Sequence, residues 1–468
     1  MPVLLCDCIR VEGRLMNRIA SRALVLFIVC GLLLGGFAFF IVEYVANAED
    51  WVLFFGSPHI YTGGNIGCGT VVDRSGILLL DLNEGRTYSN AQTLRRATVH
   101  WIGDRYGSVS APALPNYAAE LAGFDRINGV YNYGQVGGVA ELTLSAQVQM
   151  AALEAMGDYK GTVAVYNYKT GQLICAVTTP TYDPDNVPQF TEDDEQYKGL
   201  YVNRFIQSGY IPGSIFKIVT LAAALETDPE IVNKSFVCRG EYKIGNEEIT
   251  CEGAHWEQTL KEAFCNSCNC AFAEIALQLG AETLTSYVEK FGVVKPVSFD
   301  GITTNMGNFQ IANNADLNLA WASIGQHLDL VNPCAFMTFI GAVANDGKVT
   351  NPYLVEEITV GGSRTYDAKV RGGDRIMSEE TAAILQEYMQ NNVTVKYGAD
   401  NFPGLTVGAK TGTGEVEGKK PNAMLAGFVE DENYPLAFIA CVEDAGYGKA
   451  VCVPIVSKVL AAVQENVK

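Results

Sequence analysis

The sequence predicts an α+β protein, with an antiparallel sheet flanked by helices that follows one membrane-spanning segment and a small membrane-proximal domain. Three observations lead to this prediction. A charge-free run occupies residues 23–42. Residues 162–179, TVAVYNYKTGQLICAVTT, join two apolar runs through Lys-Thr-Gly, which predicts a β-hairpin. Three more apolar runs, at 405–413, 423–430 and 434–443, predict further strands of the same sheet.

The composition is that of a globular protein with an acidic surface. The chain has 468 residues, of which 48% are hydrophobic and 18% charged, and its formal net charge is −19. This length accommodates two or three domains. Binding to phosphate backbones requires clustered Lys and Arg, so the charge argues against a nucleic-acid partner.

The run Ala23–Val42 has the length and composition of a membrane span. At about 1.5 Å per residue it covers the ~30 Å hydrocarbon core of a bilayer. Basic residues precede it and acidic residues follow it, which predicts a cytoplasmic N-terminus and an extracytoplasmic body. We expect an uncleaved signal anchor, with a cleaved signal peptide ending near Ala46-Asn47-Ala48 as the alternative. The flanking charges are Arg10, Arg14, Arg18, Arg22, Glu43, Glu49 and Asp50.

Four segments are expected along the chain: a cytoplasmic tail at 1–22, the anchor at 23–43, a membrane-proximal pedestal domain at 44–137 and the main domain at 138–468. Within the pedestal, Asp73–Gly76 predicts a turn into a strand. We also expect a strand at Thr98–Gly103, and from Leu142 onward a strand that turns into a helix. The last helix is expected at Val453–Val463.

The stretch Ser208–Thr220 carries the first catalytic signal. Ser214 precedes Lys217 by three residues, so the two side chains face each other across one helical turn. A serine hydroxyl needs a base beside it to act as a nucleophile at neutral pH. The uncharged run Ile218–Leu225 predicts a buried helix, and burial lowers the pKa of a lysine toward that of a useful base.

Two further motifs follow in the same order as in a known family. Ser267-Cys268-Asn269 comes 53 residues after Ser214, and Lys410-Thr411-Gly412-Thr413 begins 143 residues after Ser267. Together with Ser-x-x-Lys, they resemble the three motifs of the penicillin-recognising serine enzymes. The chain resembles the class B penicillin-binding proteins, which are membrane-anchored peptidoglycan D,D-transpeptidases. This resemblance implies a serine β-lactamase/transpeptidase-like fold for residues 138–468.

The resemblance also implies how the first two motifs act. Ser214 would attack the D-Ala-D-Ala end of a peptidoglycan stem peptide and form an acyl-enzyme. Lys217 would take the serine proton, and Ser267 would relay it to the leaving amine. Asn269 would hold Lys217 or the substrate amide.

The third motif is expected to bind the substrate. Lys410 would supply positive charge and hold the substrate carboxylate with the hydroxyls of Thr411 and Thr413. Gly412 would leave an edge strand bare so that the substrate backbone pairs along it. The N–H groups of Ser214 and Thr413 would form the oxyanion hole.

Thirteen cysteines raise the questions of disulfides and metals. Cys238 and Cys251 bracket a predicted hairpin; a disulfide and two free thiols both remain open, and related enzymes often carry a Cys pair just before the Ser-x-Asn helix. Cys265-x-x-Cys268 is the spacing of zinc ligands, but we identify no second Cys/His pair at ligand spacing. We therefore expect no metal and no cofactor, and buried free thiols around Cys270.

The resemblance implies stem peptides, β-lactams, the cytoplasmic membrane and a peptidoglycan glycosyltransferase as partners, since nothing in the chain resembles a glycan polymerase. Two enzymatic alternatives share the motifs, namely a D,D-carboxypeptidase and a serine β-lactamase. An alternative of another class is a non-enzymatic penicillin sensor or scaffold.

Overall fold

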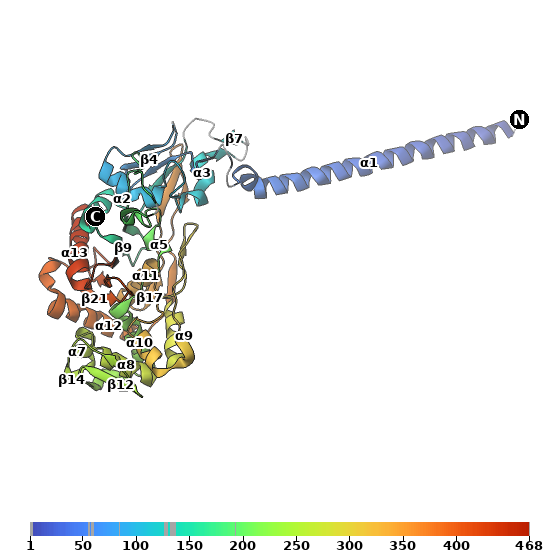
Figure 1. Ribbon diagram of the computed structural model, residues 1–468. Helices are drawn as coiled ribbons and strands as arrows, with labels where there is room; N and C mark the ends of the chain where they lie inside the picture. Colours follow the sequence, from blue (N-terminus) through green and yellow to red (C-terminus); the bar gives the residue numbers. More distant parts are fainter. Residues whose placement is uncertain are drawn as a thin grey trace.

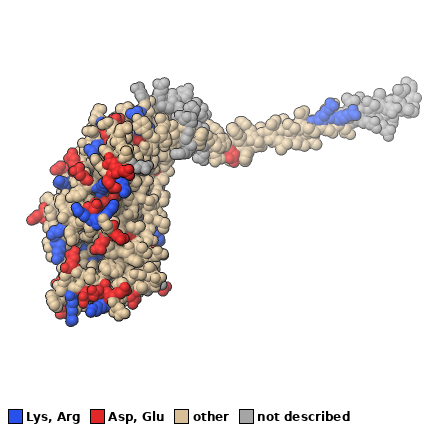
Figure 2. Space-filling model, in the orientation of Figure 1, with Lys and Arg blue, Asp and Glu red and all other residues tan. Residues whose placement is uncertain are grey.

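A computed structural model describes residues 3–54, 57, 60–83, 85–125, 130–131, 137–191 and 193–467. One long helix, α1 (Val3–Val52), projects from the folded body (Figure 1). Its part Met16–Ala48 is long and apolar enough to cross a membrane, and Figure 2 shows an uncharged stretch between basic residues toward the N-terminus and an acidic residue near the body. The predicted span 23–42 lies within it. The side chains of four flanking charged residues lie outside the described part of the structure: Arg10, Arg14, Glu49 and Asp50.

The predicted antiparallel sheet is confirmed. It has five strands in the order β10-β9-β23-β22-β21, so β21 lies at an edge. The hairpin expected at 162–179 is β9–β10, and the three later apolar runs are β21, β22 and β23. The bounds are Lys160–Asn167 (β9), Leu173–Thr179 (β10), Val407–Gly414 (β21), Asn422–Val429 (β22) and Leu436–Glu443 (β23).

Helices cover both faces of this sheet. On one face α4 (Ala146–Met156) and α13 (Gly448–Asn466) pack together and share a hydrophobic core with the strands. On the other face lie α11 (Pro333–Ala344) and α12 (Glu379–Asn392). Because both faces are buried, the strands are continuous apolar runs in the sequence and do not alternate with polar residues. The last helix begins earlier than the predicted Val453.

Helix α6 (Lys217–Thr227) is the centre of a helical region that adjoins this sheet. The uncharged run Ile218–Leu225 of α6 is buried, as predicted, and Lys217 at the start of the helix is buried with it. The helices α7 to α9 and the strands β11 to β14 lie at the end of the body farthest from α1 (Figure 1). The bounds are Ser235–Cys238 (β11), Glu241–Ile244 (β12), Glu247–Thr250 (β13), Trp256–Thr259 (β14), Leu260–Cys265 (α7), Asn269–Leu279 (α8), Ala281–Phe291 (α9) and Asp316–Ala322 (α10).

A second, mixed sheet lies near the base of α1. Its order is β19-β18-β8-β3-β4-β5, with β3 parallel to β8 and all other neighbours antiparallel. Strands from both sides of residue 138 therefore build one sheet. The bounds are Thr70–Val72 (β3), Leu78–Asp81 (β4), Thr87–Tyr88 (β5), Val139–Leu142 (β8), Val355–Val360 (β18) and Ser363–Asp367 (β19).

Two local predictions near this sheet have different outcomes. The strand expected at Thr98–Gly103 is wrong: residues 98–102 are the end of helix α2 (Gln92–Ile102), and Gly103 is its C-cap. This end of α2 is buried on all sides, so the sequence there lacks the polar positions of a surface helix. The turn into a helix is confirmed, because Ser145 caps α4 by accepting from Val148 N, but the strand before it, β8, ends at Leu142, where the predicted strand begins.

The remaining elements are short. They are Tyr61–Thr62 (β1), Asn65–Ile66 (β2), Leu114–Tyr117 (η1), Ala118–Ala122 (α3), Phe124–Asp125 (β6), Val130–Tyr131 (β7), Glu195–Tyr197 (η2), Arg204–Gln207 (α5), Gly213–Phe216 (η3), Pro229–Asn233 (η4), Ser298–Phe299 (β15), Ile302–Thr303 (β16), Ala312–Asn314 (η5), Lys348–Thr350 (β17), Gly372–Arg375 (β20), Val393–Tyr397 (η6) and Ala399–Asn401 (η7).

Candidate active site

Ser214 lies in the 3₁₀ turn η3, which leads directly into α6. This turn packs against the edge strand β21. Gly213 has a φ of 53°, and a Cβ built on it would lie 2.3 Å from Thr413 O. Only glycine fits both the backbone angle and the close approach, so the sequence before Ser214 holds the hydroxyl against β21.

Lys217 connects the first two motifs. Its Nζ lies 2.9 Å from Ser214 Oγ, 2.8 Å from Ser267 O and 2.7 Å from Asn269 Oδ1. The Asn269 amide is oriented by its Nδ2, which donates to Thr250 O at 2.8 Å. Two partners of Lys217 are therefore pure acceptors, and a neutral amine that donates to both directs its lone pair toward the serine hydroxyls.

Burial makes a neutral Lys217 accessible near physiological pH. The side chain is fully buried, and its Nζ lies 5.8 Å from the centre of the Phe272 ring. Desolvation lowers the pKa of Lys217 from 10.5 to about 8, although nearby acidic groups, Cys251 first among them, oppose the shift.

Ser267 lies in the tight turn between α7 and α8. Its φ is 55°, a left-handed conformation that is strained for a serine and is held here by the two flanking helices. Helix α7 begins with a capping box formed by Thr259 and Glu262. The turn directs Ser267 Oγ between two lysines, at 3.2 Å from Lys217 Nζ and 3.0 Å from Lys410 Nζ.

Lys410 is buried on β21 and also donates to Thr411 O at 3.1 Å. Its Nζ lies 6.0 Å from the centre of the Phe264 ring. Burial, and then the nearby positive charge of Lys217, hold the pKa of Lys410 well below its ordinary value of 10.5. The free site therefore disfavours two charged lysines at once, and an anion placed beside Lys410 would restore its charge.

Two side chains that the sequence did not single out support β21. The Tyr397 hydroxyl accepts from Thr411 N at 3.0 Å and bonds Thr411 Oγ1 at 3.1 Å. Gln326 donates from Nε2 to Thr413 O at 3.0 Å and accepts from Glu415 N at 3.3 Å. No motif marks these residues, because each reaches the site from a separate turn.

Gly412 has a packing role that the sequence did not predict. A Cβ on Gly412 would lie 2.5 Å from Pro212 O, so its bare face is filled by the turn that carries Ser214. Gly414 is similar, with a Cβ position 2.2 Å from Ile211 O. These glycines let the segment just before Ser214 approach β21 closely. Thr411 and Thr413, which alternate with them, line a cleft beside Ser214.

Six motif residues line one cleft of about 600 Å³: Ser214, Ser267, Asn269, Lys410, Thr411 and Thr413. Lys217 lies beneath Ser214. The cleft walls also include Tyr397 and Gln326, and a peptide of several residues fits such a volume.

The disulfide considered between Cys238 and Cys251 is not formed in this structure. Both are free thiols. The hairpin that they bracket is present as β12–β13, but the two sulfurs are part of a larger group that also contains His255 and Cys268. Cys268 therefore belongs to this group, and Cys265, which the Cys-x-x-Cys spacing pairs with it, lies outside the group.

Comparison with known proteins agrees with this geometry. Residues 161–461 match the family described as penicillin binding protein transpeptidase domain. Over 364 residues the chain is 29% identical to peptidoglycan D,D-transpeptidase PbpA of Mycolicibacterium smegmatis, covering 70% of this chain and 72% of that protein. It is 28% identical over 344 residues to stage V sporulation protein D of Bacillus subtilis, covering 68% and 52%.

Among solved structures, an acyl-enzyme complex of penicillin-binding protein A from M. tuberculosis superposes with a TM-score of 0.74 at 24% identity, covering 86% of this chain and 98% of that one. A D,D-transpeptidase domain from Eggerthella lenta gives 0.73 at 25% identity, covering 85% and 98%. The family match over residues 161–461 thus includes the five-stranded sheet for all but its first residue and all three motifs. The chain belongs to the penicillin binding protein transpeptidase domain family.

Proposed function

We propose that this chain is a peptidoglycan D,D-transpeptidase that cross-links stem peptides through an acyl-enzyme on Ser214. One observation carries the proposal: Lys217 Nζ lies 2.9 Å from Ser214 Oγ while donating to two groups that can only accept. A base held in this way needs no histidine. The family and the named relatives are the further support.

In the first step the carboxylate of the D-Ala-D-Ala end binds beside Lys410, Thr411 and Thr413. Its negative charge favours the protonated form of Lys410 and thereby the neutral form of Lys217. Ser214 Oγ attacks the carbonyl carbon of the penultimate D-alanine while Lys217 accepts its proton. The main-chain N–H groups of Ser214 and Thr413 hold the oxyanion, and each such donor is worth about 3 kcal/mol.

In the second step the peptide C–N bond breaks. Ser267 Oγ, placed between both lysines, passes a proton to the departing amine and recovers one from Lys217. D-Alanine leaves and the ester remains on Ser214. An amine of a neighbouring stem peptide then attacks the ester, its proton returns to Ser214 through Lys217, and a new amide is the cross-link. A β-lactam enters by the same route, and its ester persists.

We also propose how the protein is oriented in the membrane and how its chain is divided into domains. Arginines before the span and Glu43 after it support a cytoplasmic N-terminus and an extracytoplasmic catalytic region. We divide the chain into a tail (1–22), an anchor (23–43), a pedestal (44–137) and a transpeptidase domain (138–468), with β8, β18 and β19 of the last completing the pedestal sheet. A peptidoglycan glycosyltransferase would supply the glycan strands.

Two experiments on the full chain in detergent test this function. Mass spectrometry after incubation with benzylpenicillin should find one penicilloyl ester on Ser214, and none in Ser214→Ala. Rapid release of penicilloate would indicate a β-lactamase, and no adduct would indicate a scaffold; either outcome contradicts the proposal. A stem-peptide donor with an amine acceptor should yield D-alanine and a cross-linked product, whereas hydrolysis alone would indicate a carboxypeptidase.

A further inference from the structure

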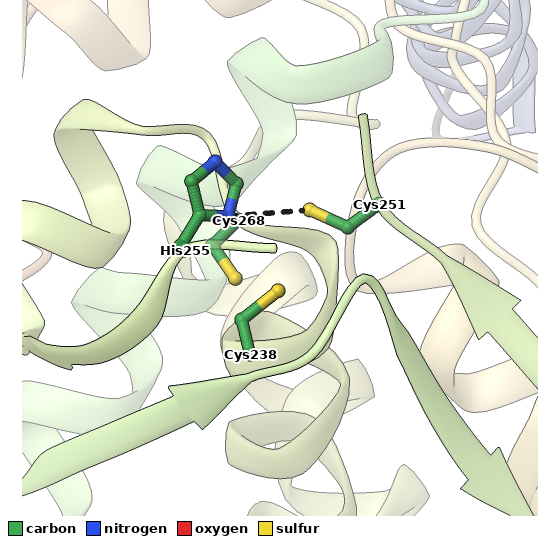
Figure 3. Close-up of side chains that lie close together, drawn as sticks. All are labelled: Cys238, Cys251, His255 and Cys268. Atoms are coloured by element: carbon green, nitrogen blue, oxygen red, sulfur yellow. Dashed lines mark hydrogen bonds between the residues drawn. The ribbon is translucent and has the colours of Figure 1, made fainter. Parts of the chain in front are cut away.

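Three thiols and one imidazole converge beside the Ser-x-Asn turn. The Sγ atoms of Cys238, Cys251 and Cys268 and one ring nitrogen of His255 all lie within 4.8 Å of one another. Figure 3 shows the four side chains directed toward a common point, with His255 Nδ1 3.6 Å from Cys251 Sγ. Cys238 and Cys268 are buried, and the other two are half-buried.

We propose that these four residues bind a structural zinc ion. Zinc bound by sulfur at about 2.3 Å and by imidazole nitrogen at about 2.0 Å holds its ligand atoms roughly 3.5 to 3.8 Å apart in a tetrahedron. The four ligand atoms lie within 4.8 Å of one another, so small side-chain shifts would bring them to these distances. A disulfide between Cys238 and Cys251 would use two of the four groups and leave Cys268 and His255 without a shared partner.

The position of the cluster explains why a metal is useful there. Residues 235–259 form two small two-stranded sheets, β11–β14 and β12–β13. Only four of these residues are buried: Phe236, Cys238, Ile249 and Gln258. So small a core does not hold a segment of this length in one conformation, and natural proteins add a metal or a disulfide in such cases.

The four ligands come from separate points of this segment and from the helix beyond it. Cys238 ends β11, Cys251 follows β13, and His255 precedes β14. Cys268 is the N-cap residue of α8. A bound ion would therefore join both sheets to α8. With four protein ligands the site is closed, as in structural zinc sites, and leaves no open position for a catalytic water.

The ion would also stabilise the turn that carries two proposed catalytic residues, a consequence that rests on the proposed function. Cys268 lies between Ser267 and Asn269 in the chain, and Asn269 N donates to Cys251 Sγ at 3.3 Å. Metal bonds to Cys268 and Cys251 would hold the left-handed Ser267 and the amide that faces Lys217. The four ligands are thus positioning residues, since none of them contacts the reacting atoms.

Metal analysis of the full chain, purified in detergent under reducing conditions, tests the site. We expect one zinc per chain, and after exchange with Co²⁺ the visible absorption bands of a tetrahedral thiolate complex. Cys268→Ser and His255→Ala should lower the zinc content at least tenfold. Cys265→Ser is the matched control, because Cys265 is near in sequence but outside the cluster, and it should retain the metal.

Cys270 needs its own variant, because it lies two residues after Cys268, in the first turn of α8. Retention of zinc by Cys270→Ser supports the proposed ligands, and loss of zinc in that variant overturns the ligand set. A metal-free chain that contains a Cys238–Cys251 cross-linked peptide overturns the proposal itself. The Co²⁺ spectrum of the wild-type chain keeps the test decisive if a variant fails to fold.

The positioning role is tested by removing the ion and restoring it. Chelation should lower the rate of acylation by benzylpenicillin about tenfold or more, and added Zn²⁺ should restore it at a temperature where the metal-free chain stays folded. An unchanged rate would overturn this role. Ser214→Ala should lose acylation and keep its zinc, so failure of the metal site and failure of the proposed function give different results.

Discussion

Lys217 and Lys410 share one hydroxyl oxygen: their Nζ atoms lie 3.2 Å and 3.0 Å from Ser267 Oγ. Both side chains are buried, so two positive charges at this separation are strongly disfavoured. We therefore expect the two amines to carry one positive charge between them, and the proposed substrate carboxylate to decide which of them carries it. This relationship leads to the first two predictions.

Acylation by benzylpenicillin should depend on pH through Lys217. Its pKa is lowered to about 8, so at lower pH it is increasingly protonated and cannot accept the serine proton. We expect the second-order rate constant to rise about tenfold per pH unit at acidic pH and to level off above about pH 8. Rapid-mixing measurements with a fluorescent penicillin would show this profile, and a flat one would contradict the assignment of Lys217 as base.

Lys217→Arg should abolish acylation while keeping a cation of similar reach. A guanidinium is not deprotonated in proteins, so it cannot act as the base. We expect a loss of about 10²- to 10⁴-fold in the acylation rate. Lys261→Arg, at an exposed ion pair with Glu387, is the matched control and should acylate normally. Substantial activity in Lys217→Arg would assign proton removal to another group.

Tyr397→Phe should weaken the acylation step without unfolding the protein. The substitution removes the hydroxyl that holds both Thr411 N and Thr411 Oγ1. Loss of about 1 to 1.5 kcal/mol of hydrogen bonding corresponds to a roughly tenfold lower acylation rate. Tyr388→Phe, on the neighbouring helix α12, is the control. Equal rates in the two variants would show that Tyr397 does not position β21.

Gly412→Ala should displace the turn η3, which carries Ser214, from β21. The added Cβ would lie 2.5 Å from Pro212 O, and relief of this clash moves Ser214 relative to Thr413. A shift of about 1 Å costs on the order of 100-fold in rate. Gly209→Ala serves as the control, since its Cβ would meet only Leu330 at 3.6 Å. Normal acylation by Gly412→Ala would mean that the turn accommodates the methyl group.

Arg95→Ala should destabilise the protein near the pedestal. Arg95 on α2 donates two bonds of 2.7 Å to Asp183, and the two side chains are only 14% and 7% exposed. We expect about 2 kcal/mol lower free energy of unfolding, between the values for exposed and buried pairs. Arg105→Ala, at the exposed pair with Asp185, should cost less than about 0.5 kcal/mol.

The same ion pair should make the free energy of unfolding depend on pH in the acidic range. Hydrogen bonds from Arg95 lower the pKa of Asp183, so its contribution is complete above the unfolded value of about 4 and is lost as pH falls through the lower folded value. Denaturant unfolding at a series of pH values should therefore show a smaller effect of Arg95→Ala in acid. An effect that stays constant with pH would rule out the charge pair as its cause.

The catalytic motifs and the main sheet could be predicted because their signals are local. Ser214 and Lys217 share one helical turn, and the strands β9, β10, β21, β22 and β23 are apolar runs bounded by turns. The Thr98–Gly103 strand was wrong because a helix end buried on all sides has no helical pattern of polar residues. Tyr397 and Gln326 could not be found, since their roles depend on where separate turns meet.

The cysteine cluster shows what spacing can miss. Sequence spacing alone pairs Cys268 with Cys265, because the two are close in the chain. The structure instead brings Cys268 to Cys251 and His255, which have three residues between them in the chain. Twelve residues separate Cys238 from Cys251, and twelve separate His255 from Cys268. This symmetric spacing was a usable signal, but it required the two hairpins to fold back on each other.

The mixed sheet has a consequence for the order in which the chain is made. Strand β8 ends at Leu142, whereas its neighbour β18 begins at Val355. At about 5 to 20 residues per second, a ribosome needs roughly 10 to 40 s to synthesise the residues between them. Throughout that interval β8 is an exposed sheet edge, the kind of surface that pairs with other chains. We therefore expect the nascent protein to need shielding of this edge until its own later strand arrives.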